Sequence, residues 1–364
     1  MEQDKLAELR ARIDEIDRQL IELLNRRTQC VIEVGEVKSK EENFEQGRVF
    51  RPEREAQILQ RIRDLNEGPL SDDQVELLFR EVISMSIAFQ QPISVAYLGP
   101  VGTYSHSAAI KQFGRSTTVR PQPSIQDVFH QVETDNAHYG VVPVENSTEG
   151  AVNQTLDCFI DSNLRVCGEV NLPIHHALMA QRGVEVKSIQ KIYSHEQSLA
   201  QCRNWLRENL PEIQTQAVVS NAEAARLASL EENVAAIAGE LAADQFQLDL
   251  LHSNIEDQAS NATRFFVLGK QNVPPSGSDK TSLLVNTANR SGALVEVLSP
   301  FQRHGISLTR VVTRPARSGN WSYVFFIDFD GHAEEDSVAS VLDEVRSVAY
   351  DLKILGSYPR AFDN

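Results

Sequence analysis

Cysteine is scarce in this chain of 364 residues. The four cysteines are scattered without a CxxC pair, which argues against a disulfide framework and against a zinc site. Long apolar runs are also missing, because the longest, such as residues 324–327, have the length of a strand. The first residues lack the apolar core of a signal peptide. We therefore expect a cytoplasmic protein without a transmembrane helix and without a metal.

Positive charge is in deficit as well. The chain has 35 lysines and arginines against 51 acidic residues, a net charge of −16. This balance argues against nucleic acid and anionic membranes as partners. If the substrates are anions, the binding site must therefore concentrate its cations locally. The hydrophobic content of 41% is that of a globular protein, and the length predicts two or three domains.

The N-terminal part has the pattern of an all-helical domain. Positions in steps of three and four from residue 6 to residue 38 are mostly apolar, which indicates one long amphipathic helix. Pro52 suits the first turn of a second helix that extends to about Asn66. Ser71 then suits the cap of a third helix, whose apolar stripe continues to Phe89.

The pattern changes after Pro92. Strand-like and helical segments alternate up to residue 270, which predicts an α/β fold with a largely parallel sheet. Within it, we expect a helix to begin at Ser147 and continue through Leu156. Residues 272–278 have the composition of a linker. The remainder follows the order βαββαβ, which predicts a ferredoxin-like module.

Polar side chains interrupt the apolar stripes of all three N-terminal helices. Arg27 and Lys38 stand where the heptad requires an apolar residue, Glu55 opens the stripe of the second helix, and Ser86 and Gln90 share a face of the third. A single long cation could extend its charge to solvent at a helix end. Five intrusions on three helices instead favour a shared site, because buried cations must be met by an anion.

Three polar clusters stand at the ends of predicted strands in the central region. They are residues 145–146, 194–197 and 261–264. A glycine-containing turn that carries Thr103 and Ser105 also opens a helix there and suits a carboxylate. Each cluster alone could be a helix cap or a structural pair. Together they favour one shared site at the ligand-binding edge of the sheet.

The N-terminal region resembles the all-helical chorismate mutase family, which rearranges chorismate to prephenate. The resemblance implies that arginines bind the two carboxylates, that Lys38 and Gln90 donate to the ether oxygen, and that Glu55 accepts from the ring hydroxyl. It also implies an intertwined dimer in which the partner chain supplies one arginine, Arg10. The implied site residues are Arg10, Arg27, Lys38, Arg54, Glu55, Ser86 and Gln90.

The central region resembles the prephenate dehydratase family through its Thr263-Arg264-Phe265 motif. Prephenate loses water and carbon dioxide together, so the leaving hydroxyl must be protonated. We expect Thr263 to donate to this hydroxyl and Glu145 to be its possible proton source. Arg264 is either a carboxylate ligand or a structural salt-bridge residue. The remaining implied substrate-binding residues are Thr103, Ser105, Asn146 and Gln197. Neither reaction needs a metal or an organic cofactor.

The βαββαβ tail resembles the ACT domain, a regulatory module that binds amino acids. The resemblance rests on residues 291–295 and 308–315, and it implies phenylalanine as an effector. The implied binding residues are Gly292, Ala293, Leu294, Thr313 and Arg314. ACT modules usually pair side by side, so we expect a homodimer or a homotetramer.

The three resemblances together are those of the bifunctional chorismate mutase–prephenate dehydratases of phenylalanine biosynthesis. They imply an all-helical mutase domain at 1–92, a two-lobed α/β dehydratase domain at 93–270 and an ACT domain at 281–359. One alternative is a monofunctional dehydratase whose helices only dimerise, against which the polar residues on these helices argue. Another is a non-catalytic amino-acid sensor, against which Thr263 in its motif argues.

Overall fold

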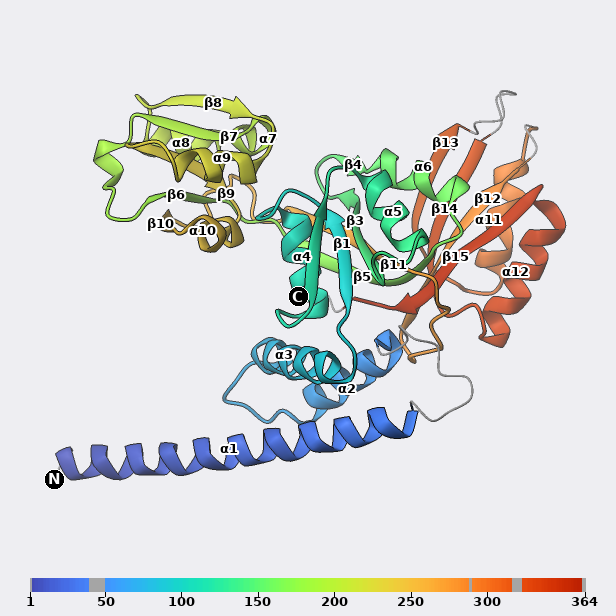
Figure 1. Ribbon diagram of the computed structural model, residues 1–364. Coiled ribbons are helices and arrows are strands. Elements are labelled where there is room, and N and C mark those ends of the chain that lie inside the picture. The colour runs from blue at the N-terminus through green and yellow to red at the C-terminus, as the bar shows by residue number, and fades with distance from the viewer. Residues whose placement is uncertain (1, 39–49, 288–289, 316–322, 362–364) are drawn as a thin grey trace.

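The computed structural model describes residues 2–38, 50–287, 290–315 and 323–361. Figure 1 shows three N-terminal helices along one side of a central α/β region, with a third module beyond it. The helices are α1 (Glu2–Lys38), α2 (Pro52–Leu65) and α3 (Asp72–Gln90). Helix α3 begins with a capping box. The Ser71 hydroxyl accepts from the backbone amide of Gln74, and the Gln74 side chain accepts from the backbone amide of Ser71. All three predicted helices are confirmed.

Helix α1 leaves an apolar stripe exposed. Its leucines and isoleucines from Leu6 to Leu24 are 41–62% exposed. Figure 1 shows its N-terminal half extending past α2 and α3, so these two helices do not cover it. None of the helices in the described ranges is both long and apolar enough to cross a bilayer.

The central region has two lobes, each built on a sheet of mixed direction. The first sheet has the order β2-β1-β3-β11-β5. Its strands are β1 (Ser94–Leu98), β2 (Thr118–Gln122), β3 (Tyr139–Asn146), β5 (Arg165–Pro173) and β11 (Ala262–Gly269), with the short β4 (Gly150–Ala151) beside β3. Strand β1 is parallel to β2 and β3, but β11 is antiparallel to β3 and β5.

The prediction of a largely parallel sheet is therefore wrong. Strand β11 returns from the second lobe and enters the first sheet between β3 and β5. The second sheet, of order β10-β6-β9-β7-β8, is mixed too, because β6 is antiparallel to β9 and β10 whereas β7 is parallel to β8 and β9. Its strands are β6 (Ala177–Gln181), β7 (Lys191–His195), β8 (Gln214–Val218), β9 (Val234–Ala238) and β10 (Leu248–His252).

Helices cover both sheets. Helix α4 (Tyr104–Phe113) packs on one face of the first sheet, and α5 (Ile125–Glu133) and α6 (Asn153–Asp161) pack on the other. The second lobe carries α7 (Glu196–Gln201), α8 (Arg203–Asn209), α9 (Asn221–Ala228), α10 (Glu240–Phe246) and the short 3-10 helix Val186–Ser188. Residues 174–176 and 253–261 join the lobes, which Figure 1 shows standing apart. The predicted two-lobed α/β architecture is confirmed.

The helix expected from Ser147 begins later, at Asn153. The side-chain oxygen of Asn146 accepts hydrogen bonds from the backbone amides of Thr148 and Glu149 at 3.0 and 3.2 Å. Such a local side-chain bond satisfies donors that a helix would otherwise leave unpaired, and it favours a turn. The chain then adds the short β4 before the helix starts.

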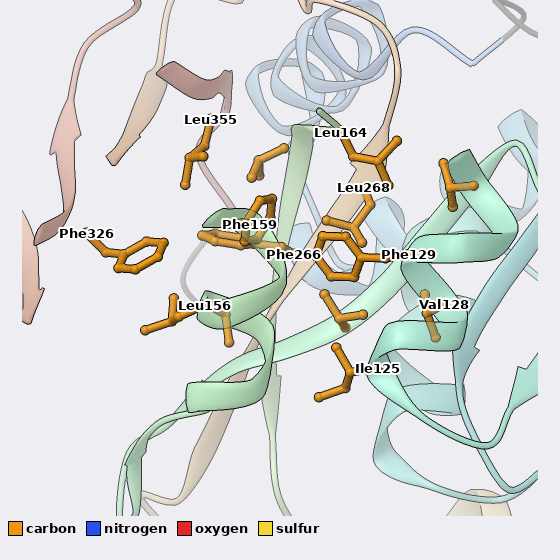
Figure 2. Close-up of a cluster of buried hydrophobic side chains, with 14 of the residues drawn as sticks. Ile125, Val128, Phe129, Leu156, Phe159, Leu164, Phe266, Leu268, Phe326 and Leu355 are labelled. Atoms are coloured by element: carbon orange, nitrogen blue, oxygen red, sulfur yellow. The ribbon is translucent and has the colours of Figure 1, made fainter. Parts of the chain in front are cut away.

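The C-terminal module has the predicted ferredoxin-like topology, with strand order β13-β14-β12-β15. Its elements are β12 (Asp279–Asn286), α11 (Ala293–Arg303), β13 (Leu308–Pro315), β14 (Tyr323–Asp330), α12 (Asp336–Val348) and β15 (Asp351–Pro359). One face of its sheet packs on α11 and α12. The other face packs on the central region, where Phe326 and Leu355 join Phe159 and Phe266 in one buried cluster (Figure 2).

Candidate functional site

A cavity of about 330 Å³ lies between the three N-terminal helices. Five of the predicted mutase residues line it, from all three helices or their ends. They are Arg27, Arg54, Glu55, Ser86 and Gln90. A third arginine, Arg51, also lines the cavity and had no predicted binding role. The polar positions that interrupt the helical stripes therefore meet at one place.

The cavity holds its polar groups through contacts between α1 and α3. Arg27 donates from Nη1 to Ser86 Oγ at 2.5 Å, and this hydroxyl donates to the carbonyl of Val82 at 2.6 Å. Gln90 donates from Nε2 to the carbonyl of Val31 at 2.9 Å. Burial lowers the pKa of Arg27 from its usual value. A cation in this setting is suited to an anionic ligand.

Glu55 is a buried carboxyl group at the wall of this cavity. Its Oε1 accepts a hydrogen bond from Arg80 Nη1 at 2.8 Å, while Arg80 also pairs with Glu76. Burial raises the pKa of Glu55 to about 7, because desolvation outweighs the attraction of Arg80. Glu55 therefore changes its charge near neutral pH.

Two predicted mutase residues, Lys38 and Arg10, are not found at the cavity of their own chain in the described part of the structure. Lys38 is the last residue of α1, and its side chain lies outside the described part. Arg10 is exposed and precedes Arg27 by 17 residues, which is about 25 Å along a helix. Its role therefore stays a prediction that requires a second chain.

Thr263 and Asn146 meet in the first lobe although more than a hundred residues separate them. They are paired across β11 and β3, so their side chains share one face of the sheet. Asn146 donates from Nδ2 to Thr263 Oγ1 at 2.8 Å. Backbone amides bond the other side-chain atom of Asn146, which identifies that atom as the oxygen. Thr263 is only 8% exposed.

Glu145 lies on the opposite face of the sheet from Thr263. A bulge shifts the register, so that Phe265 pairs with Pro143 but Arg264 pairs with Glu145. The carboxylate of Glu145 lies 3.2 Å from the Nε of Arg310, a residue of β13 in the C-terminal module. The geometry therefore does not support a direct proton relay from Glu145 to Thr263, and the catalytic role of Glu145 stays a prediction.

Arg264 is engaged by the protein itself. Its guanidinium contacts Glu169 at 2.7 Å and Asp328 at 2.5 Å, and it donates to the hydroxyl of Tyr358 at 2.9 Å. Its side chain is 12% exposed and points to the C-terminal module. Of the two roles that the sequence left open, these contacts favour the structural one over binding of a substrate carboxylate.

Sequence reasoning missed a chain of polar side chains that continues from Asn146. Asn146 Nδ2 donates to Asn261 Oδ1 at 3.1 Å, and Asn261 Nδ2 donates to Gln201 Oε1 at 3.3 Å. His176 Nε2 lies 2.8 Å from the same Gln201 oxygen, and its Nδ1 lies 2.7 Å from the hydroxyl of Tyr104. Because Gln201 belongs to α7, this network joins the two lobes beside Thr263.

These missed residues gave little sequence signal. Asn261 adjoins the Thr263 motif and could have been chosen with it. His176 stands in the segment that joins the lobes, and no spacing rule relates it to Gln201. Burial lowers the pKa of His176, so its neutral form can donate from Nε2 to the amide oxygen of Gln201.

The other predicted dehydratase residues lie at helix starts in the two lobes. Thr103 caps α4, and its hydroxyl lies within bonding distance of the carbonyls of Leu98 and Pro100, at 3.2 and 3.0 Å. Ser105 is buried in the first turn of the same helix. Gln197 stands in the first turn of α7 in the second lobe. Their contact with a substrate stays a prediction.

The predicted effector residues occupy two parts of the C-terminal module. Gly292 lies in the turn before α11 with a φ of +83°, and Ala293 and Leu294 begin that helix. Thr313 is exposed on β13, the edge strand of the sheet. Arg314 pairs with Asp157 of α6 at 2.7 Å, so it contacts the central region. Its contribution to an effector site stays a prediction.

Comparison with known proteins assigns a family to each region. Residues 9–91 match chorismate mutase type II, residues 95–273 match prephenate dehydratase, and residues 281–347 match the ACT domain. A bifunctional chorismate mutase/prephenate dehydratase of Pseudomonas aeruginosa is 50% identical over 361 residues, which are 99% of each chain. The chain belongs to the bifunctional chorismate mutase/prephenate dehydratase family. A member from Aquifex aeolicus is 43% identical and covers 98% of this chain and 99% of its own.

A solved structure resembles a large part of the enzyme. It is the prephenate dehydratase of Arthrobacter aurescens in complex with L-Phe, with a TM-score of 0.68 and 33% identity over 74% of this chain and 90% of that one. The enzyme therefore combines mutase, dehydratase and ACT domains and acts in aromatic amino acid biosynthesis. The predicted family is confirmed, while the individual site residues and the domain boundaries stay predictions.

The buried position of Glu55 predicts a pH dependence of the mutase reaction. With a pKa of about 7, Glu55 becomes a carboxylate, the better hydrogen-bond acceptor, only as the pH rises through neutrality. We expect kcat/KM for chorismate to rise through about pH 7, and Glu55→Gln to remove this rise. The dehydratase reaction with prephenate, measured over the same pH range, is the control. A wild-type mutase profile that falls through pH 7 would contradict the role of Glu55 as an acceptor.

Proposed function

We propose that the cavity between α1, α2 and α3 rearranges chorismate to prephenate. Arg27 and Arg54 bind the carboxylates, Lys38 and Gln90 donate to the ether oxygen as it gains negative charge, and Glu55 accepts from the ring hydroxyl. The rearrangement requires no proton transfer and no covalent intermediate, so positioning and charge placement can supply the catalysis. The convergence of arginines and neutral donors on one cavity supports this role.

The dehydratase reaction is proposed to take place at Thr263. Asn146 donates to Thr263 Oγ1, so the hydroxyl oxygen is used as an acceptor and its proton remains available. That proton can be donated to the hydroxyl that leaves prephenate as water, and Thr263 regains a proton from solvent, while breaking the bond to the departing carbon dioxide supplies electrons to the ring. The hydrogen bond from Asn146 to Thr263 is the observation that carries the assignment. Product phenylpyruvate then forms with release of water.

Phenylalanine is the proposed effector of the ACT domain. The solved relative in complex with L-Phe supports this assignment, and residues 292–294 with strand β13 form the proposed binding region. Arg310 of β13 donates to the carbonyl of Val144 at 3.1 Å and lies beside Glu145. A movement of β13 can therefore reach the strand that carries Asn146, which would change dehydratase activity.

We also propose that the enzyme is a homodimer or homotetramer in the cytoplasm. The apolar stripe of α1 is exposed in a single chain, and a second α1 is the partner that would bury it. Such an arrangement would also bring Arg10 of one chain towards the cavity of the other. Edge strand β13 offers a second surface for pairing between chains.

Two reciprocal variants test the assignment of the two sites. Thr263→Val keeps the side-chain shape and removes the hydroxyl, so we expect phenylpyruvate formation from prephenate to fall at least about 100-fold with mutase activity kept. Arg27→Met should lower mutase activity and leave phenylpyruvate formation from prephenate unchanged. Each reaction is measured separately with its own substrate. Thr118→Val, at an exposed position of the same sheet, is the control, and a Thr263→Val variant of wild-type dehydratase rate would refute the assignment.

The effector proposal is tested by calorimetry and by dehydratase kinetics. Wild-type enzyme should bind phenylalanine and lose dehydratase rate, and Gly292→Ala should weaken binding by about tenfold, because a φ of +83° disfavours a side chain. Gly277→Ala is the matched control, since Gly277 also has a positive φ but lies in the linker. Absence of binding at millimolar phenylalanine would remove the proposal.

The oligomer is tested by sedimentation at micromolar concentration. We expect the wild type to sediment as a dimer or larger, and Leu20→Asp to shift it towards smaller species with loss of mutase activity, because the charge lies in the α1 stripe. Leu230→Asp places the same charge at an exposed leucine of the second lobe, and it should change neither the sedimentation nor the mutase activity. A monomeric wild type would contradict the proposal.

A further inference from the structure

Phe50, two residues before the start of α2, is shared by two domains. Its side chain lines the mutase cavity but is only 1% exposed. Its ring centroid lies 4.8 Å from that of Phe113 in α4 and 5.2 Å from that of Tyr139 in β3. The same side chain belongs to the hydrophobic cluster on the α4 face of the dehydratase sheet. A mutase residue is thus part of the dehydratase core.

The backbone of Phe50 is held by the dehydratase domain as well. Its carbonyl accepts from the hydroxyl of Tyr139 at 3.4 Å and from Nε2 of Gln271 at 3.3 Å. The Tyr139 hydroxyl also lies 3.1 Å from Oε1 of Gln271, so its single proton is shared between this oxygen and the Phe50 carbonyl. Both the ring and the carbonyl of Phe50 are therefore fixed from outside the mutase domain.

Helix α3 contacts the dehydratase domain closely too. Gly114 ends α4, and a Cβ added there would lie 2.3 Å from the Cβ of Ser84 in α3. The backbone amide of Arg115 donates to Glu81 of α3 at 3.2 Å. Two of the three helices that enclose the mutase cavity are thus positioned against the dehydratase domain. Figure 1 shows both helices between α1 and the first sheet.

The cavity residues follow Phe50 at once. Arg51 is its neighbour, and the first hydrogen bond of α2 runs from the amide of Glu55 to the carbonyl of Arg51 at 3.0 Å. Arg51, Arg54 and Glu55 all line the cavity. Any tilt of this first turn moves three cavity side chains together, and misplacement by about 1 Å can be costly to an enzyme.

We propose that the dehydratase domain is a working part of the mutase site, with Phe50 as the positioning residue. Seated in the dehydratase core, Phe50 fixes the first turn of α2 and so the placement of Arg51, Arg54 and Glu55. The inference rests on the mutase site proposed above. It implies that a substitution inside the dehydratase core can alter the binding of chorismate at a distance.

The test replaces a residue of the dehydratase domain and measures the mutase reaction in the full chain. Phe113→Leu loosens the seat of Phe50, so KM for chorismate should rise on the order of tenfold with a smaller change in kcat, because arginine–carboxylate contacts are made before the transition state. Phe129→Leu is the matched control. Phe129 is equally buried but packs on the opposite face of the same sheet.

A milder variant separates positioning from instability. Gln271→Ala removes one donor to the Phe50 carbonyl without opening the core, and it should raise the KM for chorismate by a smaller factor. Phe50→Leu combined with Phe113→Leu should cost less than the product of the single effects, because both act through one contact. Dehydratase rates with prephenate, measured on the same samples, report general loss of folding.

Three outcomes would overturn the inference. Phe113→Leu and Phe129→Leu could raise the KM equally, which would indicate general loosening. Phe113→Leu and Gln271→Ala could both leave the mutase kinetics unchanged. Arg27→Met could leave mutase activity intact, in which case the proposed cavity itself fails. If Arg27→Met abolishes the activity while Phe113→Leu and Gln271→Ala both behave as wild type, only the dependence on the dehydratase domain fails.

Discussion

Glu169 is a carboxylate with no exposed side-chain surface, and the join between the dehydratase and ACT domains depends on it. It accepts from Arg264 at 2.7 Å and from Lys280 at 2.9 Å, and also from the backbone amide of Ala361 at 2.9 Å. Arg264 comes from β11 of the dehydratase sheet, whereas Lys280 comes from β12 of the ACT sheet. A buried charge of this kind is tolerated only while its partners are present.

Such a cluster specifies geometry more than it adds stability, because desolvation offsets much of the attraction. Arg264 adjoins Thr263 in β11, and neighbouring residues of a strand point to opposite faces. With Arg264 held by Glu169 and Asp328, Thr263 must face away from the ACT domain. Asn146 pairs with Thr263 and Glu145 pairs with Arg264, so Asn146 lies on the Thr263 face and Glu145 on the ACT face. One face of the sheet is thus available for chemistry and the other for docking.

The sequence predicted what depends on short-range patterns. Helix α1, the Ser71 cap and the βαββαβ order were all readable, because periodicity and capping are local. The direction of β11 was not, since nothing within a strand reveals which neighbours it will enter between. The role of Arg264 depended on Glu169 and Asp328, which are distant in the chain.

In the candidate sites too, local patterns predicted some features, whereas contacts between distant parts of the chain decided others. Polar interruptions of apolar stripes identified the cavity residues, because a charge on a buried face requires a reason. A shared site for the Thr263 and Asn146 motifs was expected from the sequence, but the face that Glu145 occupies was not, because it follows from the strand register between β3 and β11, which are more than a hundred residues apart in the chain. The network through Gln201 and His176 depends on how the lobes meet, which no local signal encodes.

The chain is acidic overall, but its cations are concentrated at particular places. The mutase cavity gathers Arg27, Arg51 and Arg54 around one carboxyl group, and burial leaves Glu55 only partly ionised near pH 7. Chorismate with its two carboxylates can therefore meet a local positive excess. Arg264 of the dehydratase sheet faces the ACT domain, and Arg310 of the ACT sheet faces the dehydratase domain. Both lie against carboxylates of the protein itself. The Thr263 face instead presents amide and hydroxyl groups, so prephenate is expected to meet dipoles there, and specificity at that face rests on hydrogen-bond geometry more than on net charge.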